Sequence, residues 1–86
     1  MSEQHTDKVL LRSAILRVLE NNDTKFGLDA KAVATLLPAE GFNIPTSEVV
    51  TELDVLLDWR YIRMTNQPLD RSRRAFAITS DGRHQL

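Results

Sequence analysis

The spacing of apolar residues along the chain predicts three amphipathic helices followed by a β-hairpin. In residues 7–20, six apolar side chains share one broad face at about 100° per residue, namely Leu10, Leu11, Ala14, Ile15, Val18 and Leu19. We expect Thr6 to cap this helix and Asp7 to lie in its first turn, where the helix dipole favours a negative charge. Val9 and Leu16 lie together on the opposite side, and this pair predicts a contact with a second helix, as in a homodimer.

Two further helices precede the hairpin. Residues 26–28 predict a short strand, and Asp29 follows as the expected N-cap of a helix over 29–38. This helix should end or kink near Leu37, because a residue that precedes a proline disfavours helical geometry. Thr46 is the expected N-cap of the third helix, which runs to Trp59. The core side of that helix holds Val49, Val50, Leu53, Leu56 and Leu57.

After Trp59 the period changes from that of a helix to that of a strand. YIRMT (61–65) and RAFAIT (74–79) are rich in β-formers and are joined by the turn region NQPLDRS. They predict an antiparallel hairpin in which Ile62 and Met64 face Phe76 and Ile78. The last seven residues leave room for a helical turn at most. The fold class is therefore α+β, with residues 1–5 as a flexible start and residues 6–86 as one domain.

The composition narrows the kind of protein. Eighty-six residues, 42% apolar and 27% charged, are typical of one globular domain. The absence of cysteine excludes disulfides and thiolate metal sites. No apolar run approaches the roughly 18 residues of a membrane span, and the polar residues 1–8 do not resemble a signal peptide. We therefore expect a cytoplasmic protein with no membrane contact.

The net charge of −1 hides an asymmetry between the two parts of the chain. Residues 1–59 contain ten acidic and five basic residues, whereas residues 60–86 contain six arginines and two aspartates. The chain is thus acidic first and basic last, and this polarity bears on the choice of partner.

The order helix, strand, helix, helix, hairpin resembles that of the winged-helix family. Two stretches carry the resemblance: VVTELDVLLDWRYIRMT (49–65) is similar to a recognition helix that runs into the first wing strand of transcription regulators, and FAITSDGRHQL (76–86) to their second wing strand and the turn after it. The resemblance covers roughly residues 8–86. A fainter likeness is to small winged-helix proteins of Mu-like prophages. The resemblance to the family implies DNA binding, with the third helix as the reading helix.

The chain departs from that family at three points. Arg60 stands where a small residue is usual, and the C-terminal helix that many relatives use for dimerisation is nearly absent. The third helix is acidic, and its outward arc offers DNA only the hydroxyls of Ser47 and Thr51. The arc consists of Ser47, Glu48, Thr51, Asp54, Val55 and Asp58, with Glu52 and Trp59 on its flank. Each carboxylate near a phosphate would cost on the order of 1 kcal/mol, so this helix should not read the major groove.

The arginines of the predicted hairpin, unlike the acidic third helix, favour binding to DNA. Arg71, Arg73 and Arg74 lie at or beside the tip, and Arg60 and Arg63 lead into it. Such a wing can contact phosphates or enter a minor groove. The first hypothesis is therefore a regulator of transcription that binds duplex DNA mainly through these arginines. A solvated basic turn, or a turn that pairs with the acidic helix of a neighbouring molecule, is the alternative.

The second hypothesis is a protein-interaction module that does not bind DNA. Its contact surface would be the acidic face of the third helix around its tryptophan, since Trp is frequent among the residues that dominate protein interfaces. That face comprises Glu48, Glu52, Val55, Asp58 and Trp59. Trp59 could instead lie under the wing as a structural residue.

Catalysis is not expected from this sequence. Ser80, Asp81 and His84 are neighbours but lack the buried pocket that a catalytic triad needs. His5 and His84 stand near opposite ends of the chain, so no zinc site is predicted. We therefore expect neither enzymatic activity nor a cofactor.

Overall fold

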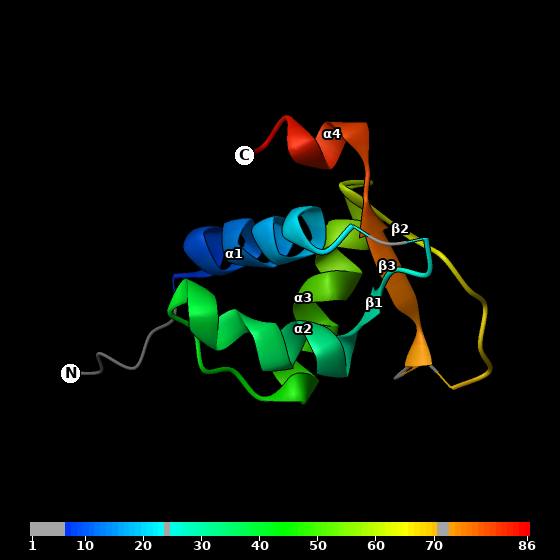
Figure 1. Ribbon diagram of the computed structural model, residues 1–86, viewed down its shortest axis with the longest axis horizontal. Coiled ribbons are helices and arrows are strands. Elements are labelled where there is room, and N and C mark those ends of the chain that lie inside the picture. Colours follow the sequence, from blue (N-terminus) through cyan, green and yellow to red (C-terminus); the bar gives the residue numbers. More distant parts are fainter. Residues whose placement is uncertain (1–6, 24, 71–72) are drawn as a thin grey trace.

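The protein has an α+β architecture, described by a computed structural model for residues 7–23, 25–70 and 73–86 (Figure 1). The elements are α1 (Lys8–Asn21), β1 (Leu28–Asp29), α2 (Ala30–Leu36), the 3-10 helix η1 (Leu37–Glu40), α3 (Thr46–Asp58), β2 (Ile62–Met64), β3 (Ala75–Ile78) and α4 (Ser80–Arg83). The three longer helices gather beside a small sheet, and α4 lies at one end (Figure 1). None of the helices described is long and apolar enough to cross a membrane.

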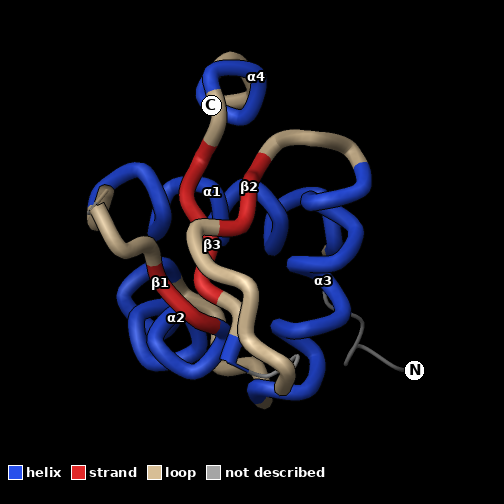
Figure 2. Tube along the Cα trace, turned by 90° about the vertical axis from the view of Figure 1, so that its right-hand side faces the viewer, coloured by secondary structure: helices blue, strands red, loops and turns tan. Residues whose placement is uncertain are grey.

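The sheet has three antiparallel strands in the order β1-β3-β2 (Figure 2). Ile62 lies opposite Ile78 and Met64 opposite Phe76, which confirms the predicted hairpin register. β1 adds Leu28 opposite Phe76 on the other side of β3. The strand predicted over residues 26–28 is thus observed over Leu28–Asp29, and it ends one residue later than predicted. The apolar side chains on one face of the sheet thereby complete the core formed by the helices.

Helix α1 begins one residue later than its sequence suggested. The carboxylate of Asp7 accepts hydrogen bonds from the backbone N–H groups of Val9 (3.0 Å) and Leu10 (3.3 Å), so Asp7 is the N-cap. The prediction of Asp7 in the first turn was wrong, and the Thr6 side chain expected in its place lies outside the described residues. A carboxylate serves both as acceptor for the free N–H groups and as counter-charge for the helix dipole.

Five of the six residues predicted on the apolar face of α1 are buried, namely Leu11, Ala14, Ile15, Val18 and Leu19, but the buried side differs from the prediction at two positions. Leu16 is 2% exposed and belongs to the core, whereas Leu10 is 56% exposed. η1, α2, β3 and α4 all contact α1, whereas residues 8–10 in its first turn are exposed. The prediction that Val9 and Leu16 form one exposed stripe was therefore wrong for Leu16, while Val9 is 70% exposed.

The boundaries of α2 and α3 follow local chemistry. The Asp29 side chain accepts from the backbone N–H of Ala32 (2.8 Å), which confirms the predicted cap. Helix α2 ends at Leu36, and η1 carries the chain through Pro38 to Gly41, whose φ of 91° closes the turn. Helix α3 begins at Thr46 itself, with Pro45 in the N-cap position, so the predicted capping by the Thr46 side chain was wrong.

The single turn α4 agrees with the prediction of a helical turn at most, and it fastens the end of the chain to the junction between α3 and β2. The hydroxyl of Thr79 donates to the carbonyl of Arg60 (2.8 Å) and accepts from the N–H of Gly82 (3.0 Å). A Cβ at Gly82 would overlap the backbone carbonyl of Tyr61, so only glycine permits this close approach. Arg83 donates hydrogen bonds to Glu20 (2.6 Å) and Asp23 (3.0 Å), and the bond that it donates to Glu20 raises the pKa of Arg83.

The burial along α1 can be tested with two glutamate substitutions six residues apart. We expect Leu16→Glu to prevent stable folding, because it places an unpaired carboxylate in the core. Leu10→Glu should change the free energy of unfolding by less than about 1 kcal/mol, because Leu10 lies largely in solvent. Urea denaturation followed by circular dichroism measures both, and equal stability of the two variants would contradict the burial of Leu16 and the exposure of Leu10.

Candidate nucleic-acid interface and the groove beside it

Glu52, one of the four carboxylates of α3, is removed from the outer surface. It is 1% exposed, shares the buried side of the helix with Val49 and Leu56, and faces α1. Its Oε1 atom accepts a 2.6 Å hydrogen bond from Nε of Arg12, and its Oε2 atom lies 3.6 Å from Nζ of Lys8. The prediction that Glu52 flanks the outward arc was therefore wrong, because cations of α1 draw this carboxylate inward.

Asp54, a second carboxylate of α3, is paired with the hairpin. Nη1 of Arg74 lies 3.6 Å from its Oδ1 atom, and both side chains are partly exposed. The connection between β2 and β3, which we call the hairpin connection (residues 65–74), thereby returns to the side of α3 (Figure 2). Arg74 thus neutralises a charge of its own chain, and a contact with an external phosphate would have to compete with Asp54.

The remaining carboxylates, Glu48 and Asp58, lie near the two ends of α3 and form no ion pair within the described ranges. The outward arc also presents Ser47, directly before Glu48, and Thr51, between Glu48 and Asp58, and both are exposed as predicted. The Thr51 hydroxyl donates to the Ser47 carbonyl at 3.3 Å, so its proton is used within the helix. The arc is consequently less acidic than its sequence suggests.

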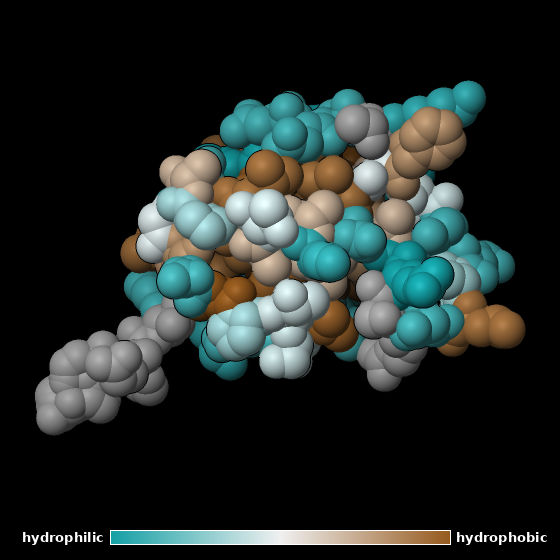
Figure 3. Space-filling model, turned by 60° about the horizontal axis from the view of Figure 1, so that its bottom comes forward, coloured by the Kyte–Doolittle hydropathy of each residue, from teal (hydrophilic) through white to brown (hydrophobic). Residues whose placement is uncertain are grey.

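The basic residues after position 59 fall into two groups. Arg74 and Arg83 are bound to acidic residues of the first part of the chain. Arg60, Arg63 and Arg73 are exposed, and none of them has an ion-pair partner among the residues that the structure describes, while Arg71 lies outside those residues. Figure 3 shows mostly hydrophilic side chains at the end of the molecule that carries the hairpin connection.

Arg60 occupies a backbone conformation that favours glycine. Its φ is 65°, its N–H donates to the carbonyl of Leu57, and the next N–H, that of Tyr61, donates to Leu56. These two bonds close the end of α3 in the way that a glycine at this position usually does. The left-handed conformation costs a non-glycine residue about 1–2 kcal/mol. The small residue expected here from the resemblance is thus replaced by a strained, exposed cation.

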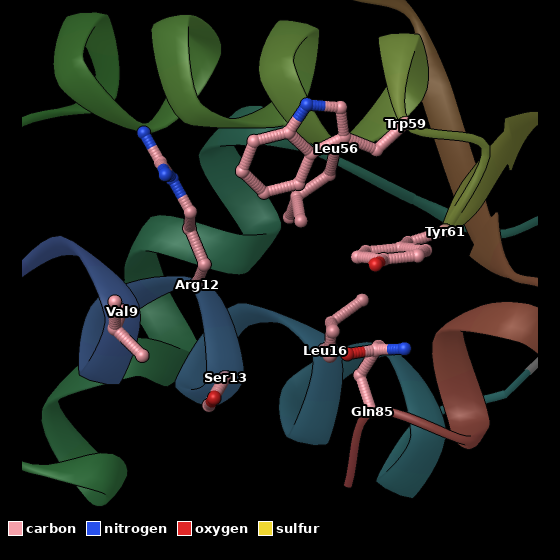
Figure 4. Close-up of a pocket in the computed structure, with 8 residues that line it drawn as sticks. All are labelled: Val9, Arg12, Ser13, Leu16, Leu56, Trp59, Tyr61 and Gln85. Carbon is pink, nitrogen blue, oxygen red and sulfur yellow. The ribbon is translucent and has the colours of Figure 1, made fainter.

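Trp59 points away from the acidic arc and lies over Arg12 of α1. The Arg12 guanidinium carbon is 5.0 Å from the centroid of the indole ring, and the ring of Tyr61 meets the indole edge-on at 5.8 Å. Together with residues of α1 and the C-terminal turn they surround a groove of about 210 Å³ (Figure 4), which we call the Trp59 groove. It is lined by Val9, Arg12, Ser13, Leu16, Leu56, Trp59, Tyr61 and Gln85.

This arrangement divides the predicted protein-interaction face. Trp59 is 48% exposed but belongs to the groove beside α1, Glu52 is buried, and Val55 is partly buried. Arg12, Tyr61 and Gln85 were not singled out from the sequence, because they come from separate segments and carry no shared motif. The one available signal was Arg12, a cation beside the apolar face of α1.

A double-mutant cycle measures the contact that shapes the groove. We expect Glu52→Gln and Arg12→Gln each to destabilise the protein, with a coupling energy of about 1–3 kcal/mol, because either change leaves the other group with a poorer partner in a buried site. The exposed pair Arg17–Glu40 (2.8 Å) is the matched control and should couple by less than about 1 kcal/mol. Equal coupling in the two cycles would contradict a special role for Glu52.

No group of three His, Asp or Glu side chains in the described part of the chain is placed to hold a metal ion. Comparison of the chain with protein-family models, with curated proteins and with solved structures gives no match. The two surfaces that the side chains form are thus an arginine-bearing hairpin beside α3 and an apolar groove beside α1.

Proposed function

We propose that the chain is a winged-helix domain that binds duplex DNA and regulates transcription. In this proposal the β2–β3 hairpin is the wing, and most contacts come from arginines in the wing and at its base. These are Arg60, Arg63 and Arg73, together with Arg71, which lies outside the described residues. Ser47 and Thr51 of α3 contribute only minor contacts.

The order of the elements supports the winged-helix assignment. Helices α2 and α3 are joined by η1 and a short turn, and the hairpin that follows α3 returns to the side of that helix. The strand order β1-β3-β2 places the short strand after α1 beside the second hairpin strand. This sequence of helix-turn-helix and hairpin is the arrangement in which a helix and a wing face DNA together.

The observation that carries the DNA proposal is the internal pairing of two carboxylates of α3. Four acidic groups on the outward arc and its flank would oppose binding to phosphates by on the order of 1 kcal/mol each before screening. Glu52 is buried against Arg12, and Asp54 is paired with Arg74, so Glu48 and Asp58 remain near the ends of the helix. The number of α3 carboxylates left to repel phosphates is therefore two instead of four.

Cations that have no ion-pair partner among the described residues provide the attraction. Arg60, Arg63 and Arg73 can each neutralise a phosphate and release a counterion, and this term depends on the phosphate backbone rather than on the bases. Because α3 offers few groups that read base edges, we expect modest sequence preference and strong salt dependence. The strained backbone of Arg60 is consistent with selection for its side chain rather than for stability.

Fluorescence anisotropy of a labelled duplex, titrated with salt, tests the proposal. We expect affinity to fall with a slope of log K on log salt near −3, since about three phosphates are neutralised. The double variant Arg63→Ala/Arg73→Ala should weaken binding at least about tenfold and reduce the slope by about two.

Arg17→Ala is the matched control, because it removes an exposed arginine from α1 that is already paired with Glu40. It should leave both affinity and slope nearly unchanged. Absence of binding at roughly 50 mM salt, or an equal loss of affinity in the Arg17 variant, would refute DNA binding through the wing.

A further inference from the structure

We propose that the Trp59 groove is the surface through which two copies of this chain associate. This inference concerns a different face from the one assigned to DNA. It rests on the shape of the groove, on the balance of charge around it, and on the exposed apolar residues at its rim.

The groove combines a hollow with projecting apolar side chains. Leu16 and Leu56 are buried and line the hollow, whereas Val9 and Trp59 line it while remaining widely exposed (Figure 4). Leu10 follows Val9 on the first turn of α1, and Leu86 follows Gln85, so two more exposed leucines adjoin the lining residues in sequence. Large apolar residues that gather at one exposed place are characteristic of interaction surfaces.

The charges around the groove compensate one another. Arg12 is the charged residue among those that line the groove, and its guanidinium donates a 2.6 Å hydrogen bond to the carboxylate of Glu52. Lys8, which is not a lining residue, lies 3.6 Å from the other oxygen of the same carboxylate. Ser13 and Gln85 add only neutral polar atoms. The Arg12 guanidinium is held between Glu52 and the indole ring, which lets a cation lie in an apolar surface with its charge satisfied.

This neutrality favours a second copy as the occupant. In a two-fold symmetric contact each residue patch meets the same patch of the partner, so a surface with a net charge repels itself. A contact between the hairpin arginines of two copies would be repulsive in this way. A strongly acidic or basic partner protein would find no complementary charge at the groove. A neutral, apolar surface with both a hollow and projecting side chains satisfies the requirement of self-complementarity.

The dimensions are compatible with such a contact. A specific interface buries about 800 Å² on each partner, which is roughly a seventh of the 5580 Å² surface of this chain. A hollow of about 210 Å³ has room for an apolar side chain from the first turn of the partner's α1. Val9 of each copy would enter the groove of the other. Leu16, predicted as an exposed contact, serves instead as part of the groove lining.

Charge exchange at Val9 tests for a second copy directly. Sedimentation equilibrium over a concentration series, without DNA, would compare wild type with Val9→Glu and Val9→Lys, alone and mixed. We expect a concentration-dependent dimer for wild type, and self-association weakened at least about tenfold in each variant, because a desolvated like charge then faces its own copy. An equimolar mixture of the two variants should recover a dimer through opposite charges.

Leu69→Glu is the control, since it adds the same charge at an exposed apolar residue of the hairpin connection. It should dimerise as wild type does, and circular dichroism should show that all variants remain folded, because Val9 is largely in solvent. A wild type that stays monomeric, or a dimer that Val9→Glu leaves intact, would overturn the proposal. Failure of DNA binding would not affect either result.

Discussion

The hydrogen bond between Arg12 and Glu52 determines what both sides of α3 present to the surroundings. It joins residues that are forty positions apart and holds α1 against α3. Because Glu52 draws Arg12 across the gap, the guanidinium lies under Trp59 and the indole closes one side of the groove. Because Arg12 draws Glu52 inward, the outward arc of α3 loses a carboxylate. A buried ion pair contributes less to stability than to the selection of one arrangement, and here that arrangement separates two surfaces.

Ion pairs between the acidic first part and the basic last part of the chain also reduce the charge that each part presents to solvent. Arg74 binds Asp54, and Arg83 binds Glu20 and Asp23, so part of the opposing charge is consumed within the molecule. On α3 and the hairpin, the charges with no ion-pair partner among the described residues are Arg60, Arg63 and Arg73, and Glu48 and Asp58 near the ends of α3. The electrostatic attraction proposed for DNA depends on the unpaired arginines. The proposed self-association depends on the absence of unpaired charge among the described residues that line the Trp59 groove.

Sequence patterns predicted the features that are encoded locally. The hairpin register follows from alternation of apolar residues, the cap at Asp29 from the side chain itself, and the end of α2 from Pro38. The burial of Leu16 and Glu52 could not be predicted in this way. Periodicity identifies residues that share a helix face, but the width of the buried face depends on how many elements surround it. Likewise, the position of Glu52 depends on cations contributed by another helix.

Chemical-shift mapping would test the separation of the two surfaces most directly. Backbone amide and indole N–H signals would be followed at constant protein concentration while a short duplex is added at low salt. We expect shifts at Ser47, Thr51 and Arg73, with the Trp59 indole and the first turn of α1 unchanged. Shifts concentrated at Trp59, Arg12 and Val9, with the hairpin unaffected, would contradict the assignment of DNA to the wing and of self-association to the groove.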